Sequence, residues 1–261
     1  MKALEKYLSQ SIPKGYVCLS VNGRTAVACH WAVPAFRNIL ENQTLHDWAA
    51  AQSQQEQFTG RGINFGVYLP ATGISEKSIK VVVRRNRHGG LLGGITGEYF
   101  TTPSRAPQEL AIYRRLAASS INTPEVVGYA LYPAFPGFVR ADIVTRRLPE
   151  GGDLPDLWKS ADRQRRDRLI EAAARLLNKL AAARIRHSDL NMKNIYIADN
   201  RVHLTPFLLD IDRVTFNEPG DVAKRNFNRL ARSMRKWRDK WGLDIQEKDI
   251  ERLAAVLKES F

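Results

Sequence analysis

β-Prone runs dominate the chain up to about residue 148, and helical periodicity dominates after it. Residues 16–31 form two β-prone runs on either side of Asn22-Gly23, the dipeptide that most strongly favours a two-residue hairpin. Residues 33–55 place Leu45 and Trp48 at helical spacing, which predicts one or two short helices. The opening third is therefore expected to contain a hairpin followed by helix.

A glycine-rich turn comes next and leads into further strands. Gly60, Gly62 and Gly66 precede or enter a β-prone run that ends near Leu69, and residues 79–84 predict another strand. Residues 106–118 then place Leu110, Tyr113 and Leu116 on one side of an amphipathic helix. The order is glycine-loop hairpin, strand and helix, followed by a strand-rich stretch that ends near residue 148.

Proline and glycine cluster at Pro149-Glu150-Gly151-Gly152-Asp153, the best linker candidate in the sequence. This position predicts an N-terminal lobe of residues 1–148 and a C-terminal lobe of residues 149–261. The second lobe is expected to contain a long amphipathic helix at 162–185, a short hairpin at 195–209 and helices from about 221 onward. We predict an α+β, two-lobed fold with a small β-rich first lobe and a mainly helical second lobe.

The candidate chemistry is concentrated in the stretch HSDLNMKN, residues 187–194. His187, Asp189 and Asn194 match the kinase pattern His-x-Asp-x-x-x-x-Asn, in which the Asp orients or accepts the acceptor's proton and the Asn binds Mg²⁺. Asp210 ends the next apolar strand, where kinases carry a second metal-binding carboxylate. Taken alone, the first motif is also compatible with a polar loop that contains two Asx turns. Asp210, at the end of the following strand, makes that alternative weaker.

Two further features have both a functional and an ordinary interpretation. Asp212 stands where the kinase glycine of Asp-Phe-Gly is expected, and it could bind metal or only pair with Arg213. The spacing of Gly60, Gly62 and Gly66 has one residue more than the kinase phosphate-binding loop. Glycine-rich hairpins are frequent, so this loop is weak evidence alone.

Arg84 occupies the place of the phosphate-binding lysine that kinases carry on their third strand. Its planar guanidinium can hold both a phosphate and Glu109, although it is not equivalent to a lysine. Lys80 is the fallback cation, and an inert arginine at the strand edge is the alternative. Glu109 can also pair with Arg105 or Arg114 instead of Arg84.

Composition narrows the class of protein. The 261 residues include 40 Lys and Arg against 27 Asp and Glu, a net charge of +13 that attracts anionic partners. The two cysteines, Cys18 and Cys29, do not form a zinc-binding pattern and predict reduced thiols. The N-terminal residues lack a signal-peptide core, and no run reaches the roughly 18 apolar residues of a transmembrane helix. We expect a protein on the cytoplasmic side, free or at a membrane surface.

Together these motifs resemble the bacterial lipopolysaccharide inner-core kinases, in particular the 3-deoxy-D-manno-octulosonic acid (Kdo) kinases. The segments that carry the resemblance are RRNRHGG at 84–90, RADIVT at 140–145, HSDLNMKNI at 187–195 and LLDIDR at 208–213. The resemblance implies a protein-kinase-like fold, ATP with Mg²⁺ or a similar divalent ion, and phosphoryl transfer to a sugar hydroxyl of Kdo–lipid A. It also implies that an arginine at position 84 is a family feature.

The acceptor that this resemblance implies is a polyanionic glycolipid on the inner leaflet of the inner membrane. The basic segment that we expect to meet that surface comprises Lys224, Arg225, Arg229, Arg232, Arg235, Lys236, Arg238 and Lys240. A solvated helix face is the alternative, and Trp237 and Trp241 fit either a core or an interface. Lys193 is a hypothetical neighbour of the transferred phosphate.

Other functions differ from this one in what they predict. A kinase of a heptose or of a small-molecule hydroxyl would have the same ATP-side residues and a different acceptor. A pseudokinase or scaffold is suggested by Arg84 and the altered glycine loop, but the four residues His187, Asp189, Asn194 and Asp210 argue against it. Nucleic-acid binding is suggested only by net charge, without a recognised motif, and is not expected.

Overall fold

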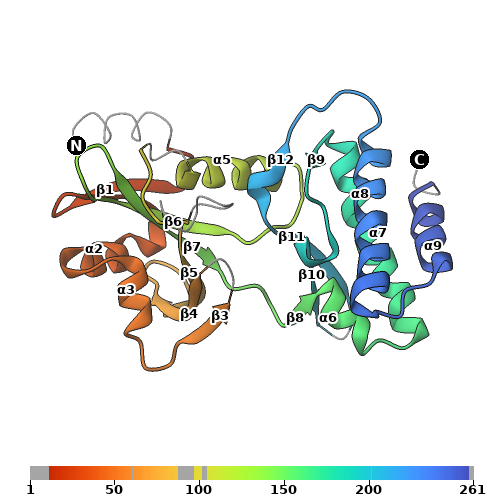
Figure 1. The fold of residues 1–261 in the computed structure, drawn as a ribbon. Coiled ribbons are helices and arrows are strands. Elements are labelled where there is room, and N and C mark those ends of the chain that lie inside the picture. Colours follow the sequence, from red (N-terminus) through yellow and green to blue (C-terminus); the bar gives the residue numbers. More distant parts are fainter. Residues whose placement is uncertain (1–11, 60–61, 88–96, 102–104, 201, 259–261) are drawn as a thin grey trace. The chain divides into compact units, whose positions relative to one another are not determined.

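The computed structural model describes residues 12–59, 62–87, 97–101, 105–200 and 202–258. The chain packs as two compact units, one formed by Met1–Ala111 with Glu125–Arg147 and the other by Ile112–Pro124 with Leu148–Phe261. Figure 1 shows the strands of the first unit in red to green and the helices of the second in green to blue. The predicted glycine Gly60 lies outside the described residues.

One antiparallel sheet of seven strands forms the centre of the first unit. Its strands, in chain order, are β1 (Tyr16–Val21), β2 (Arg24–Cys29), β3 (Glu56–Thr59), β4 (Ile63–Pro70), β5 (Ser78–Arg85), β6 (Val126–Pro133) and β7 (Val139–Arg146). In space they follow the order β1-β2-β6-β7-β5-β4-β3. Strand β5 therefore lies inside the sheet, between β4 and β7.

The first hairpin forms where the sequence predicts it. Val21 pairs with Arg24 across the turn, and Asn22 and Gly23 both have positive φ, 48° and 78°. Two successive positive φ angles are what a type I′ turn requires, which is why Asn-Gly is favoured there. The turn thus fixes the register of β1 and β2.

Helices pack on the first unit's sheet through alternate strand residues. The predicted helical segment forms η1 (His30–Ala32), α2 (Val33–Asn42) and α3 (Leu45–Ala50). Phe36 and Leu40 of α2 are fully buried in one hydrophobic core with Val81 and Val83 of β5. Because successive strand residues point to opposite faces of the sheet, the side chain of Arg84 points to the face opposite this core.

Helix α5 (Arg105–Ala118) matches the predicted amphipathic helix. Its first part belongs to the first unit, and its last residues belong to the second unit. Leu116, near its end, is fully buried in the hydrophobic core of the second unit. Glu109 lies in the part that belongs to the first unit.

The described residues of the second unit contain the end of α5 and the helices α6 (Leu154–Lys159), α7 (Arg163–Ala182), α8 (Val222–Trp241) and α9 (Glu247–Lys258). Helices α7, α8 and α9 lie side by side (Figure 1) and contact one another. Asp221 caps the start of α8 by accepting from the Lys224 N–H, and Gly242 ends it with φ of 64°. Gly242 thus divides the helical region predicted from residue 221 into two helices.

Short strands hold the loops of the second unit. Strand β10 (Ile195–Asp199) lies between β11 (Leu204–Leu208) and β8 (Gly151–Asp153), and β9 (Arg186–His187) pairs with β12 (Val214–Thr215). The predicted linker thus includes a strand. A Cβ atom at Gly151 would lie 2.1 Å from the carbonyl oxygen of Ile197, so only glycine allows β8 to approach β10 this closely.

Within the described ranges, none of the helices combines the length and the apolar character needed to cross a bilayer. The longest helices, α7 and α8, have 20 residues each and carry many charges.

Candidate active site

In the first unit, Arg84 and Glu109 come together. Arg84 Nη2 donates to Glu109 Oε1, and the two side chains are 35% and 12% exposed. Arg105 Nη1 donates instead to the carbonyl oxygen of Arg87 (2.8 Å), and the fallback cation Lys80 pairs with Glu56. Arg84 is the cation of β5 that meets the carboxylate of α5, and its use for phosphate stays a prediction.

Two of the three predicted loop glycines are described. Gly66 lies within β4 opposite Glu56, and a Cβ atom there would lie 2.9 Å from the ring of Phe58. A Cβ atom at Gly62 would lie 3.3 Å from Cδ of the flexible Arg87 side chain. Cross-strand packing therefore accounts for Gly66, and contact with a nucleotide phosphate stays a prediction for both glycines.

In the second unit, His187 joins the two halves of the predicted catalytic motif. Its ring is buried, Nδ1 accepts from the backbone N–H of Asp189 (3.2 Å), and Nε2 lies 3.2 Å from the carbonyl oxygens of Leu209 and Asp210. Because Nδ1 is an acceptor, the ring hydrogen belongs on Nε2, where both carbonyls can accept it. Burial lowers the pKa of His187, although those carbonyls oppose the effect, so the ring is neutral at pH 7. His187 therefore orients backbone and does not supply a charge.

Asp189 presents a carboxylate at the surface of the loop. Its side chain is 45% exposed, and Oδ1 accepts from Nη2 of Arg229, a residue of α8. Its backbone carbonyl accepts from the side-chain amides of Asn191 (3.1 Å) and Asn194 (2.9 Å). The loop thus fixes the backbone of Asp189 while its carboxylate stays accessible.

Asn194 and Asp210 stand on segments that are hydrogen bonded to each other. The backbone N–H of Leu209 donates to the carbonyl oxygen of Asn194 (2.8 Å). Asp210 has φ of 53° and ψ of 49°, a left-handed conformation that aspartate tolerates better than most residues. Since Asn194 Nδ2 donates to Asp189, its amide oxygen is the atom left for a ligand. Asp212 lies two residues farther along the chain, with Oδ1 4.0 Å from Nε of Arg213.

The donor set fits a divalent cation that is shared with phosphate. Among the described residues there is no group of three or more His, Cys, Asp or Glu side chains that could enclose a metal alone. Mg²⁺ commonly takes only one or two protein ligands and completes its shell with phosphate oxygens and water. An amide oxygen from Asn194 and a carboxylate from Asp210 match that requirement.

Helix α8 supports the loop from behind, which sequence reasoning missed. The side chain of Asn226 accepts from the N–H of His187 (3.1 Å) and donates to the carbonyl of Ile185 (2.9 Å). Ser233 Oγ accepts from the N–H of Met192 (3.1 Å). Both side chains are buried. In the sequence, the sign of this role was a pair of small polar residues on the apolar side of the predicted helix.

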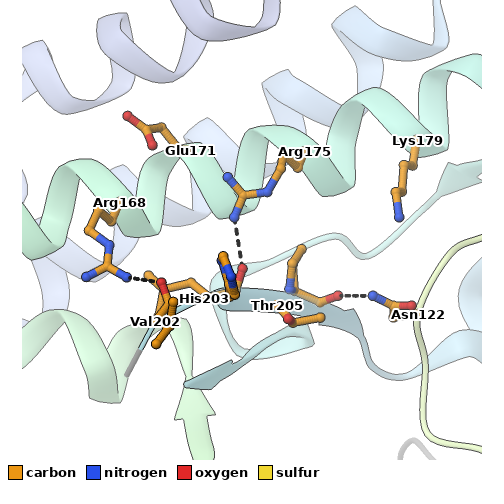
Figure 2. A pocket seen from close by; sticks show the side chains of 10 residues that line it. Asn122, Arg168, Glu171, Arg175, Lys179, Val202, His203 and Thr205 are labelled. Atoms are coloured by element: carbon orange, nitrogen blue, oxygen red, sulfur yellow. Dashed lines mark hydrogen bonds between the residues drawn. The ribbon is translucent and has the colours of Figure 1, made fainter. Parts of the chain in front are cut away.

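Two cavities of the second unit differ in how their cations are used. One, of about 410 Å³, is lined by Asp189, Asn191 and Lys193 of the loop and by α8; we call it the α8 cavity. The other, of about 450 Å³, runs along α7 and β11 (Figure 2). There Arg168 donates to the carbonyl of Val202 (3.0 Å) and Arg175 to that of Leu204 (2.8 Å), so both arginines hold protein backbone.

Comparisons with known proteins agree with this arrangement. The sequence profile of the Lipopolysaccharide kinase (Kdo/WaaP) family matches residues 71–256. A 3-deoxy-D-manno-octulosonic acid kinase of Vibrio vulnificus is 26% identical over 79% of this chain and 84% of its own length. The enzyme of the same name from Vibrio cholerae is 28% identical over 68% of this chain and 72% of its own.

Among solved structures, WaaP in complex with acyl carrier protein matches with a TM-score of 0.52 and 16% sequence identity, over 86% of both chains. This likeness concerns the fold. The prediction of an α+β, protein-kinase-like fold with a β-rich first part and a mainly helical second part is confirmed.

Proposed function

Since the chain belongs to the Lipopolysaccharide kinase (Kdo/WaaP) family, we propose that it transfers the γ-phosphoryl group of ATP to a hydroxyl of Kdo on Kdo–lipid A. The predicted enzyme class, a kinase acting on a sugar hydroxyl, is confirmed by that membership. ATP as donor, Mg²⁺ as the ion and Kdo as acceptor belong to the proposal.

The observation that carries the proposal is the constellation around Asp189. A half-exposed carboxylate, the amide of Asn194 and the segment of Asp210 are joined by hydrogen bonds through His187, Leu209 and the Asp189 backbone. Phosphoryl transfer requires such a carboxylate beside the acceptor and cation ligands beside the phosphates, and little covalent chemistry from the protein.

Each residue then has one task. Asp189 orients the acceptor hydroxyl and receives its proton, while His187 keeps the loop in place. Asn194 and Asp210 hold the cation, with Asp212 as a further ligand. Arg84, fixed by Glu109, binds nucleotide phosphates, a task that we also propose for the backbone at Gly60, Gly62 and Gly66. Bound Mg²⁺ would neutralise phosphate charge during transfer.

The net charge of +13 fits an anionic glycolipid acceptor at the cytoplasmic face of the inner membrane. Exposed Lys and Arg near such a surface contribute about 1 kcal/mol each. Peripheral attachment through exposed basic residues of α8 is therefore part of the proposal. Cosedimentation with anionic vesicles, weakened by salt, would test it separately from catalysis.

The direct experiment is transfer of labelled phosphate from ATP to purified Kdo–lipid A. We expect transfer by the wild-type protein and none above background by Asp189→Ala or Asp210→Ala. A panel with heptose-containing core glycolipids and small-molecule hydroxyl acceptors identifies the preferred acceptor. Normal turnover by either variant would contradict the assigned roles, and absence of transfer to Kdo by the wild type would contradict the proposed acceptor.

A further inference from the structure

Helix α8 carries two kinds of positive charge. Arg235 and Arg238 pair with Glu247 of α9, and Arg225 pairs with Glu218 (3.3 Å). Arg232 and Lys236, by contrast, form no ion pair with any carboxylate in the part of the chain that the structure describes. They stand four positions apart, so they are neighbours on the helix and repel each other. An anion bound between them would remove that repulsion.

These two cations lie where catalysis is proposed. Both line the α8 cavity, together with Lys193, Arg229 and Asp189. Four cations and one carboxylate give the cavity a net charge of +3. Its volume of about 410 Å³ falls within the range of small-molecule sites. The cavity is therefore large enough and positive enough for a small anionic ligand beside Asp189.

Arg229 connects the cavity to the candidate catalytic group. Its Nη2 donates to Asp189 Oδ1 and its Nε to the carbonyl of Ser188 (3.4 Å). Nη1 makes no hydrogen bond to the described residues, so both of its N–H donors have no protein acceptor there. One guanidinium can thus hold Asp189 and a ligand carboxylate or phosphate at once.

Two indole rings add an apolar wall to the same cavity. The ring centroids of Trp237 and Trp241 are 4.4 Å apart, and Trp241 is 54% exposed. Lys193 Nζ lies 5.8 Å from the Trp237 centroid, and Lys236 Nζ lies 5.1 Å from that of Trp241. Rings beside ammonium groups suit a ligand with a C–H face and a negative charge, which describes an acidic sugar.

We propose that the α8 cavity is the acceptor subsite, in which Arg232, Lys236 and Arg229 bind the carboxylate or phosphate of an acidic sugar whose hydroxyl faces Asp189. This assignment rests on the proposed function and adds the part of the protein that selects the acceptor. Lys193 also lines this subsite. The cations that are paired with Glu218 and Glu247 lie outside it.

The test compares two double variants with equal loss of charge. Arg232→Gln with Lys236→Gln removes the two unpaired cations of the cavity. Lys159→Gln with Lys248→Gln removes two exposed lysines of the same unit that do not line it. For each protein, KM for deacylated Kdo acceptor and KM for ATP are measured, together with fluorescence titration by free Kdo.

We expect the cavity variant to raise the acceptor KM about 10-fold or more, the value of one charge-assisted hydrogen bond, with KM for ATP unchanged. It should also lose the saturable fluorescence change, while the control variant keeps wild-type values. Equal KM shifts in both variants, or a higher KM for ATP alone, would overturn the subsite. So would loss of binding to anionic vesicles with an unchanged acceptor KM, because the cavity would then serve the membrane.

The two proposals fail in different ways. Absence of transfer by the wild type to any Kdo acceptor overturns the proposed function. Efficient transfer with an acceptor KM that does not depend on Arg232 and Lys236 overturns only the acceptor subsite.

Discussion

Asp142 in the first unit and Asp189 in the second unit both pair with an arginine, but the two pairs differ in burial and in the number of their partners. Asp142 is fully buried and accepts from the N–H of His46 (3.0 Å) and from Arg85 Nε (3.3 Å). Asp189 is 45% exposed, and one guanidinium, that of Arg229, meets its carboxylate.

The partners of the two arginines complete the contrast. Arg85 Nη2 also donates to Asp47 (2.8 Å) and to the hydroxyl of Thr44 (3.2 Å), and its Nε lies 3.1 Å from a carboxylate oxygen of Glu98, so this guanidinium meets three carboxylates. Arg229 meets one carboxylate among the described residues, that of Asp189, and its Nη1 makes no hydrogen bond to them. A buried carboxylate in a network of several charged partners stabilises the fold, whereas a half-exposed pair is accessible to a ligand.

Asp189→Asn gives the sharpest test of the second half of that contrast. It keeps the shape of the side chain and removes its capacity to accept a proton. We expect phosphoryl transfer to fall about 10³- to 10⁴-fold, with the unfolding temperature unchanged because the side chain is half exposed. Labelled-phosphate assays and thermal unfolding measure the two quantities. A variant that loses stability and activity together would make Asp189 structural.

Asp142→Ala tests the other half. Removing this carboxylate leaves Arg85 partly buried without its central partner and the His46 N–H without an acceptor. We expect a loss of about 3–5 kcal/mol in the free energy of unfolding, measured with urea. Asp47→Ala removes a carboxylate of the same network that is 54% exposed, and about 1 kcal/mol or less is expected. Equal losses for the two variants would refute the buried network.

Arg84 and Arg85, which are neighbours on β5, allow a third test, in which each is replaced by lysine and a smaller effect is expected. Arg84→Lys keeps the charge and loses the planar fork that meets Glu109, so we expect the KM for ATP to rise about 10-fold with little change in stability. Arg85→Lys should leave that KM unchanged and lower stability instead. If each variant changed both quantities alike, the two faces of β5 would not have separate roles.

The smallest expected effect is a change in pH dependence. Burial raises the pKa of Asp142, although Arg85 and the His46 N–H oppose this, so the folded state binds the proton more tightly than the unfolded chain does. Stability from this group is greatest below the ordinary aspartate pKa of about 3.9 and is lost as pH rises through the raised value. The cost of Asp142→Asn should therefore shrink as pH rises through that window in urea titrations. A constant cost would contradict the raised pKa.

Local patterns explain what the sequence could predict. The Asn22-Gly23 hairpin, the helix α7 and the strand pair β10–β11 depend on near neighbours in the chain, and each forms where its pattern predicts. His187, Asp189 and Asn194 belong to one loop, so their spacing was visible. Their roles remain predictions.

Long-range pairing explains what was missed. Arg229 lies 40 residues from Asp189 in sequence, and no periodicity links them. Strands β2 and β6, and strands β5 and β7, are neighbours in the sheet although they lie far apart in the chain. The pairing of β5 with β7 brings Asp142 to Arg85. The glycines after Pro149 indicated a linker, yet Gly151 serves close strand packing. The net charge of the chain does not show which cations of α8 form ion pairs and which do not.

The central claim is that this chain phosphorylates Kdo through Asp189, and one measurement tests it most directly. Core glycolipid is isolated from cells that produce either the wild-type chain or Asp189→Asn, and mass spectrometry with fragmentation locates the phosphate. We predict one additional phosphoryl group on Kdo with the wild type and none with the variant. Identical glycolipids from the two strains, or a phosphate on another sugar, would contradict the claim.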